Sequence, residues 1–348
     1  MAYSSGSTIL DDDYNIFVTG NASGTGDDNT PNVNTIWGSG TGNKGYGQSG
    51  LLSSVSVGTT ITATQWTNLI NRLSTIRQHQ GSSIGITNPT VGDTITAFAA
   101  LQNDINDAFN NRLDAHASGS DITSGGSVSG TTSWYTQAQT TTTVTFSSAD
   151  AARYFFNSGG IIRQTPIRSG TNNQKSTSWN TFASAIGTIE FTNGSPCTIG
   201  GTSYTGTNLE GNTGTPSILA SNTGFYDLTP GGSPVTIFKQ FLSADYDYDT
   251  NFIQVDVSLN SSSTALTFVM TFRDDAADEP APTVGSSSTT DERDTEPTPF
   301  IDFSGSETLD QVQGTTGTTT VVRQPSTTFI ANTWGTPTIS GSISYITS

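Results

Sequence analysis

The chain has 348 residues, of which 32% are hydrophobic and only 12% are charged. Its formal net charge is −17, from 29 acidic and 12 basic residues. Proteins that bind duplex nucleic acid rely on clusters of Lys and Arg that displace counterions, so we expect no nucleic-acid partner. Low hydrophobicity combined with 9% aromatic residues predicts thin cores rather than disorder.

The chain also shows no sign of membrane insertion or of a disulfide framework. No apolar run approaches the roughly 18 residues that span a bilayer. The first residues, "MAYSSGSTIL", lack the basic and apolar parts of a signal peptide, which predicts synthesis in a cytoplasm. The single cysteine, Cys197, cannot form an internal disulfide and lies in a turn-like context without a basic neighbour. We therefore expect a buried, unreactive thiol.

Residues 1–58 are rich in Gly, Ser, Thr, Asn and Asp, with short apolar islands at "YNIFVTG" and "NTIWGSG". These islands are too sparse for the segment to bury a core of its own. We predict an extended N-terminal arm with one or two strands that pair with another part of the structure. A disordered tail is the alternative.

Residues 59–118 carry the clearest helical pattern, with two apolar stripes at i, i+3, i+4 and i+7 spacing. The stripes consist of Trp66, Leu69, Ile70, Leu73 and Ile76, and of Ile95, Phe98, Leu101, Ile105, Phe109 and Leu113. We predict a helical hairpin. Its candidates for structural or intersubunit contacts are Trp66, Leu69, Leu73, Phe98, Ile105 and Phe109. Each stripe is narrow, so we expect the hairpin to pack on the β part or on other copies.

The stretch "SSADAARYFFNSGGIIRQTPIRSG", residues 147–170, combines a glycine pair with two arginines and could be mistaken for a phosphate loop. Ser147 or Ser148 is suited to cap a helix, and Gly159 stands where a C′ glycine would end it. Phosphate-binding glycines precede a helix, whereas these follow one. We therefore predict a structural corner. Its structural or interface candidates are Tyr154, Phe155, Phe156 and Gly159.

From residue 119 onward we predict a β domain. After a hinge at 118–130, short strand-like segments alternate with turn residues. They include "TQAQTTTTVTF", "GIIRQTPIR", "IGTIEFTN", "SPVTIFKQFLS", "FIQVDVSLN", "ALTFVMTF", "TTVVRQP" and "ISGSISYITS". "FIQVDVSLN" alternates cleanly, "ALTFVMTF" is typical of a central strand, and 171–186 favours a short helix. The predicted fold class is mainly β: an antiparallel sandwich-like domain, 119–348, preceded by the arm and the hairpin.

The acidic residues give no clear chemical site. Residues 274–296 hold eight of the 29 acids and indicate a solvated loop, with a cation-binding or partner-contacting flap as the alternative. In "DYDYD", Asp245, Asp247 and Asp249 alternate as in a calcium loop, but the glycine at the sixth position and the glutamate at the twelfth are missing. We therefore predict no metal and no cofactor.

Only two histidines could serve a hydrolytic triad, His79 and His116, and each falls near the C-terminal end of a predicted helix. A protonated imidazole is favourable there because of the helix dipole. We assign no catalytic residue, and the prediction is a protein that is not an enzyme.

Three phrases carry a resemblance to a known class of proteins. The helix "ITATQWTNLINRLSTIRQHQ", together with "ARYFFNSGGIIR" and "DYDYDTNFIQVDV", resembles virion structural proteins of tailed phages, especially those of marine cyanobacteria. The resemblance covers roughly residues 60–270 and includes no catalytic signature. It implies a particle component of the neck, tail, baseplate or fibre, assembled in the host cytoplasm.

Three functions follow as hypotheses. The first is a virion structural protein whose partners are copies of itself and other virion proteins, in a symmetric oligomer. The second is a fibre or adhesin that binds host-surface glycan through exposed aromatic residues. The third is a hydrolase, which would need two carboxylates placed across a cleft.

Overall fold

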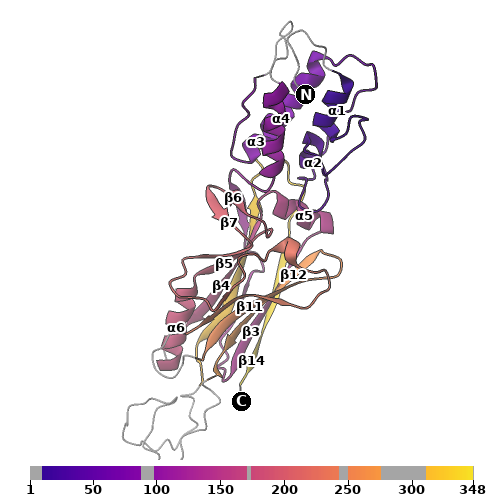
Figure 1. Ribbon diagram of the computed structural model, residues 1–348. Coiled ribbons are helices and arrows are strands. Elements are labelled where there is room, and N and C mark those ends of the chain that lie inside the picture. Colours follow the sequence, from indigo (N-terminus) through magenta and orange to yellow (C-terminus); the bar gives the residue numbers. More distant parts are fainter. Residues whose placement is uncertain (1–9, 88–97, 171–173, 243–249, 276–310, 348) are drawn as a thin grey trace, which may run out of the picture.

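The computed structural model describes residues 10–87, 98–170, 174–242, 250–275 and 311–347. The molecule is elongated, with four helices at one end, two β-sheets toward the other end, and helix α5 with the β6–β7 hairpin between them (Figure 1). We call the helices α1–α4 and their loops the helical head, and the two sheets with α6 the sandwich. The predicted class, mainly β with antiparallel sheets, is confirmed.

The helical head contains more helix than the sequence predicts. Its helices are α1 (Asp11–Thr19), α2 (Val33–Trp37), α3 (Ala63–His79) and α4 (Phe98–Asn110). The predicted hairpin is confirmed as α3 and α4, and Thr62 caps α3 in a capping box with Gln65. The hairpin packs on α2, and Trp66 of α3 also contacts Phe17 of α1.

The prediction of an extended N-terminal arm is wrong for the described residues of that segment. Residues 11–19 and 33–37 are helical, and Tyr14, Phe17 and Val18 are buried in the common core. These three residues fall at i, i+3 and i+4, which is a one-sided helical stripe. The stripe is too short to predict a helix by itself, and α3 and α4 supply the apolar surface that the segment lacks.

The sandwich consists of two six-stranded antiparallel sheets. The first has the order β1-β13-β4-β5-β8, with β2 also pairing with β13, and the second has the order β14-β3-β12-β11-β10-β9. The strands of the first are β1 (Ser118–Ile122), β2 (Ser127–Gly130), β4 (Ile161–Ser169), β5 (Thr188–Phe191), β8 (Thr207–Glu210) and β13 (Thr315–Pro325). Those of the second are β3 (Gln137–Thr145), β9 (Ile218–Leu219), β10 (Val235–Phe241), β11 (Phe252–Leu259), β12 (Ala265–Arg273) and β14 (Thr338–Ile346).

Several strand predictions are confirmed in detail. In β11, Ile253, Val255, Val257 and Leu259 are buried while the alternate residues are half-buried, and β12 is central, between β3 and β11. Helix α6 (Gln174–Ile186) occupies the predicted position. The prediction of a hinge at 118–130 is wrong. Strands β1 and β2 form there because they pair with β13, about 200 residues further along the chain.

The remaining elements lie beside the sheets. They are α5 (Ala149–Asn157), the hairpin β6 (Cys197–Ile199) and β7 (Thr202–Tyr204), and the 3-10 turn Phe225–Asp227. A continuous apolar core runs from the head into the sandwich. A second, smaller apolar cluster involves the β6–β7 hairpin and includes Leu113, Ile161, Cys197 and Tyr204.

Candidate functional site: the joint between head and sandwich

Helix α5 forms the joint where the two parts meet, and its capping agrees with the sequence prediction. Ser148 Oγ accepts a hydrogen bond from Ala151 N at 3.0 Å, and the helix ends at Asn157. Gly159 has φ of +93°, and a Cβ there would lie 2.5 Å from Ala115 Cβ. Only glycine suits this position, both for its left-handed backbone and for its space. The predicted structural corner is confirmed.

The aromatic residues of α5 link the core of the head to that of the sandwich. Phe155 and Phe156 are fully buried, and their ring centroids lie 5.0 Å apart. Phe156 stacks on Phe225 at 4.6 Å, and Phe155 contacts Phe146 at 5.1 Å. Phe191 of β5 completes the cluster at 6.1 Å from Phe156. Such ring pairs add to the free energy of burial, so this cluster is a rigid connection.

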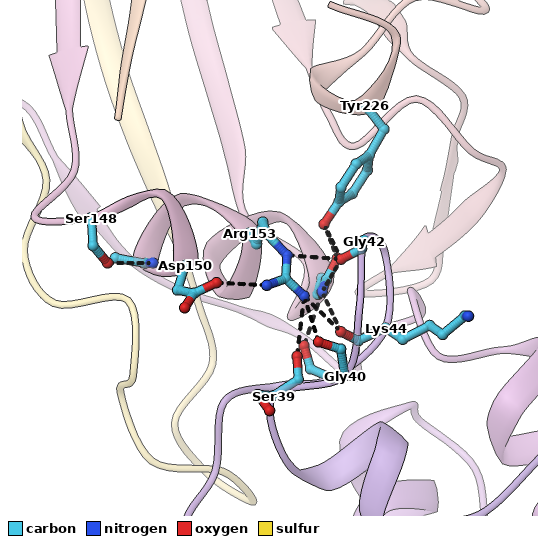
Figure 2. A network of polar contacts seen from close by, with 11 residues as sticks. Ser39, Gly40, Gly42, Lys44, Ser148, Asp150, Arg153 and Tyr226 are labelled. Atoms are coloured by element: carbon cyan, nitrogen blue, oxygen red, sulfur yellow. Dashed lines mark hydrogen bonds and ion pairs between the residues drawn. The ribbon is translucent and has the colours of Figure 1, made fainter. Parts of the chain in front are cut away.

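A network of polar contacts joins α5 to the loop of residues 38–48, which we call the docking loop (Figure 2). The Arg153 guanidinium donates to the backbone carbonyls of Ser39 at 3.1 Å, Gly40 at 3.0 Å and Gly42 at 3.1 Å. Asp150, one turn earlier, pairs with the same guanidinium at 2.6 Å. The Arg153 side chain therefore supplies hydrogen-bond donors to three backbone carbonyls of the docking loop.

Two further side chains complete this network. Asn157 Nδ2 donates to the carbonyls of Gly45 at 2.9 Å and Lys44 at 3.2 Å. The Tyr226 hydroxyl lies 2.9 Å from the Gly42 carbonyl and 2.7 Å from Asn157 Oδ1. Burial raises the pKa of the Tyr226 hydroxyl above its ordinary value, so it stays a donor at every physiological pH.

The docking loop also binds the far end of the chain. Gln48 forms a paired contact with Ala331, donating to its carbonyl and accepting from its amide, both at 2.9 Å. Gly47 has φ of +70°, and a Cβ there would lie 2.4 Å from the ring of Tyr154. These contacts fix the orientation of the head on the sandwich.

The predicted hairpin candidates lie inside the head. Trp66, Leu69, Leu73 and Ile105 are buried, and Phe109 is partly buried against the same core. Helix α4 begins at Phe98, whose side chain lies outside the described residues. The buried residues stabilise the head internally, and the sequence offered no way to distinguish that role from an intersubunit one.

An open groove on the head is the candidate ligand site. It lies between α3 and the loop after the docking loop and has a volume of about 630 Å³. Its lining is mostly polar and consists of Tyr14, Gly50, Leu51, Leu52, Ser53, Gln65, Asn68, Asn71, Arg72 and Thr75. The Arg72 guanidinium lies 4.0 Å from the centroid of the Trp37 ring and donates to the Gly50 carbonyl at 3.0 Å. Amide and guanidinium groups of this kind bind polar ligands by paired hydrogen bonds.

His79 lies at the C-terminal end of α3 as predicted, whereas His116 lies six residues beyond the end of α4. His79 is buried, and its ring lies 4.9 Å from that of Tyr46. Burial lowers the pKa of His79 to about 4, so the imidazole is neutral rather than the cation expected beside the helix dipole. His116 is exposed and contacts Phe329 at 5.8 Å.

The other nucleophile candidates are equally structural. Cys197 is buried as predicted, and burial raises the pKa of its thiol to about 11. Residues 81–85 read Gly-Ser-Ser-Ile-Gly, the spacing of a nucleophile elbow. They follow helix α3, however, whereas that motif joins a strand to a helix.

The acidic candidates lie largely beyond the described residues. Asp245, Asp247 and Asp249 fall outside them, as does the acidic segment from 276 onward. Within the described part of the chain, no three His, Cys, Asp or Glu side chains form a group that could hold a metal ion. In the same part, no helix has the length and hydrophobicity to cross a membrane. Asp274, the first residue of the acidic segment, is buried rather than solvated.

Comparison with known proteins adds no relative. No protein-family model, no curated protein and no solved structure matches this chain.

Proposed function

We propose that this chain is a non-enzymatic structural component of a tailed-phage virion. It assembles as a symmetric oligomer in the tail, neck, baseplate or fibre, and it resides in the virion after assembly in the host cytoplasm. Its partners are copies of itself and other virion proteins. The proposal starts from the three sequence phrases that resemble such proteins, and one feature of the sandwich supports it further.

The supporting observation is the edge strand β14. Among the described residues it pairs only with β3, so its other edge presents backbone amides and carbonyls. The strand is nine residues long, "TISGSISYI", and carries no charged side chain. Its outward side chains include Ser340, Ser342 and Ile346, all exposed. Soluble monomers protect such edges with charges or prolines, and an unprotected edge is suited to pair with another chain.

The rigid joint supports the same function. Arg153, Asn157 and the aromatic cluster of α5 hold head and sandwich in one fixed relation. A particle subunit that binds neighbours at both ends must keep the distance and orientation between those ends constant. An elongated molecule with a continuous core meets that requirement (Figure 1).

Sedimentation velocity over a wide concentration range tests the proposal. We expect association of the wild type and a weaker association of Ser342→Lys, because facing lysines on paired edge strands repel each other. Ser56→Lys, an exposed change in the head, is the charge-matched control and should associate like the wild type. A wild-type protein that stays monomeric at every concentration would contradict the proposed oligomer.

The groove on the head favours a second candidate, a fibre that binds host-surface glycan. Its Gln65, Asn68 and Arg72 side chains offer the donors and acceptors that sugar hydroxyls require. A glycan array should show binding that Asn68→Ala abolishes. Asn103→Ala, an exposed asparagine on α4, is the matched control. No binding by the wild type, or equal losses in both variants, would reject this candidate.

A further inference from the structure

A lysine and an aspartate meet in the interior of the sandwich. Lys175 Nζ lies 2.8 Å from Asp274 Oδ2, and both side chains are 0% exposed. Lys175 is the second residue of α6, and Asp274 directly follows β12. Because Ala265 pairs with Thr145 and Arg273 with Gln137, Asp274 lies at the end of the sheet remote from α5 and the head.

The surroundings hold both groups in place. The Asp274 amide donates to the Thr136 carbonyl at 2.9 Å, and the side chain of Asn251, also buried, lies beside the Asp274 carboxyl and stabilises its charged form. Lys175 Nζ lies 5.9 Å from the centroid of the Tyr135 ring. The pair therefore has a fixed geometry without access to bulk water.

Aromatic rings close the same region. Trp179, one turn further along α6, contacts Trp134 at 5.2 Å and Phe272 at 6.3 Å. Both tryptophans and Phe272 are fully buried. An apolar wall of this kind keeps the local dielectric constant low.

Such a setting raises the free energy of the ion pair and so increases the population of the neutral acid and amine. Removing two opposite charges from water is costly, and their attraction offsets that cost only in part. Burial raises the pKa of Asp274 to about 6 even though the contact with Lys175 acts in the opposite direction. Transfer of one proton from the ammonium to the carboxylate yields an uncharged amine, which is a nucleophile, and a carboxylic acid, which is an electrophile.

We propose that Lys175 and Asp274 condense into an intramolecular isopeptide bond. The lone pair of Nζ attacks Cγ of the protonated carboxyl group, and a C–N bond forms. The Cγ–O bond of the acid hydroxyl then breaks, and that hydroxyl leaves as water with one proton from the amine. The remaining carboxyl oxygen becomes the amide carbonyl, so atoms and charges balance and no oxidant or cofactor is needed.

The buried site favours the condensation by proximity, by stabilising the developing charge and by excluding water. Fixing the two groups at contact distance gives an effective concentration on the order of 10⁵ M or more, which favours condensation over the separate groups. The Asn251 amide is placed to stabilise the oxygen that becomes negative during attack. Exclusion of bulk water also protects the amide from hydrolysis.

The bond would tie the two sheets together. Helix α6 connects β4 to β5 in the first sheet, whereas β12 is central in the second. A covalent link between them therefore prevents the sheets from separating at the end remote from the head. This is a modification site with a mechanical purpose, and it stands whether or not the chain belongs to a virion.

Mass spectrometry of the denatured full-length chain tests the proposal. We expect a mass lower than that of the sequence by one water molecule. Proteolysis should release a branched peptide that contains both Lys175 and Asp274. Lys175→Arg should abolish the mass deficit and the branched peptide, whereas Lys239→Arg, a lysine on β10 without a facing carboxylate among the described residues, should retain both.

Asp274→Asn provides a second line of evidence. Its condensation would release ammonia instead of water, and the product would have the same mass as the linked wild type. A wild type with the full sequence mass and a free Lys175 peptide after prolonged incubation would overturn the proposal. That result does not depend on the folding of any variant.

Discussion

The helical head and the sandwich both have few apolar residues, and they bury different kinds of polar side chain instead. In the head, buried amide side chains bind irregular backbone. Asn15 Nδ2 donates to the carbonyls of Ala22 and Val55, both at 3.0 Å, and its Oδ1 accepts from Val55 N at 2.8 Å. Asn32 acts in the same way on the loop before α2.

In the sandwich, buried hydroxyl groups bridge regular strands. Thr140 of β3 and Thr318 of β13 share a hydrogen bond of 2.6 Å between the two sheets. Thr320 Oγ1 donates to Gln164 Oε1 at 3.0 Å on the neighbouring strand β4. Threonine suits a strand and brings its own hydrogen-bonding group, so Thr140, Thr318 and Thr320 are buried with their hydroxyl groups paired.

The difference explains why composition alone is a poor guide here. Polar residues in this chain are often buried, and their contribution to stability depends on their hydrogen-bonding partners. Amides can reach main-chain groups of a loop, whereas hydroxyls pair across a fixed sheet spacing. The two regions should therefore respond differently to the loss of a polar group and similarly to the loss of a shared apolar one.

The largest expected effect comes from the apolar cluster that both regions share. Phe156→Ala should lower the free energy of unfolding by about 3–5 kcal/mol, since it leaves a cavity at the joint. Urea denaturation followed by both tryptophan fluorescence and far-UV circular dichroism would measure this loss. Phe241→Ala, where the side chain is 38% exposed on β10, should cost much less.

The same experiment tests whether head and sandwich form one cooperative unit. With a continuous core, the two probes should give coincident transitions in the wild type. Separate transitions in the wild type would contradict the view of α5 as a rigid joint.

The second effect is the pH dependence that His79 contributes in the head. The pKa of His79 is about 4 in the folded protein, against 6.5 for an ordinary histidine. Above pH 6.5 neither state binds the proton, so His79 has no effect on stability there. As the pH falls from about 6.5 toward 4, the unfolded state alone gains a proton, and stability declines by up to about 3 kcal/mol.

Replacement of each histidine isolates this effect. His79→Phe should remove the decline between pH 6.5 and 4, whereas His116→Phe should keep it because His116 is exposed. Stability would be measured by urea denaturation at several pH values. An unchanged slope in His79→Phe would show that another group carries the dependence.

The elements that the sequence predicts are those with a local signal. Helix α3 is predicted by its apolar stripe and by the cap at Thr62, and α5 by the cap at Ser148 and the glycine that ends it, Gly159. Strand β11 is predicted by its strict alternation. Each of these signals lies within about ten residues, and the rest of the fold is not needed to interpret it.

The elements that it misses depend on distant partners. Helix α1 is stabilised by Asn15, whose partner Val55 is 40 residues away. Strands β1 and β2 are rich in Ser and Gly and exist because β13 pairs with them. The joint is equally non-local, since Arg153 binds Gly40 at a separation of 113 residues. No periodicity in one sequence encodes such contacts.

Loss of an amide in the head should have a moderate effect. Asn15→Leu keeps the size of the side chain but leaves the Val55 amide and two carbonyls without their partner. Because an unsatisfied buried group costs about 1–3 kcal/mol, we expect a loss of about 2 kcal/mol. Asn103→Leu, on the exposed side of α4, is the matched control and should be nearly neutral. Equal losses in both variants would mean that Asn15 does not hold the loop.

Loss of a hydroxyl in the sandwich should have the smallest effect, and it should be reversible by a second change. Thr140→Val deprives Thr318 of its cross-sheet partner and should cost about 1 kcal/mol. Thr318 also lies 3.2 Å from the Met270 sulfur, which limits the loss. The double variant with Thr318→Val should cost less than the sum of the single variants, because two apolar groups of the same shape then face each other.

A second threonine pair supplies the comparison for this cycle. Thr143 and Thr267 share a hydrogen bond of 3.3 Å within one sheet and are half-buried. Water can replace each lost partner there, so the coupling free energy of their double-mutant cycle should be near zero. A coupling free energy as large as that of Thr140 and Thr318 would contradict this view. It would show that strand pairing, rather than burial between the sheets, determines how much a threonine hydroxyl contributes to the free energy of unfolding.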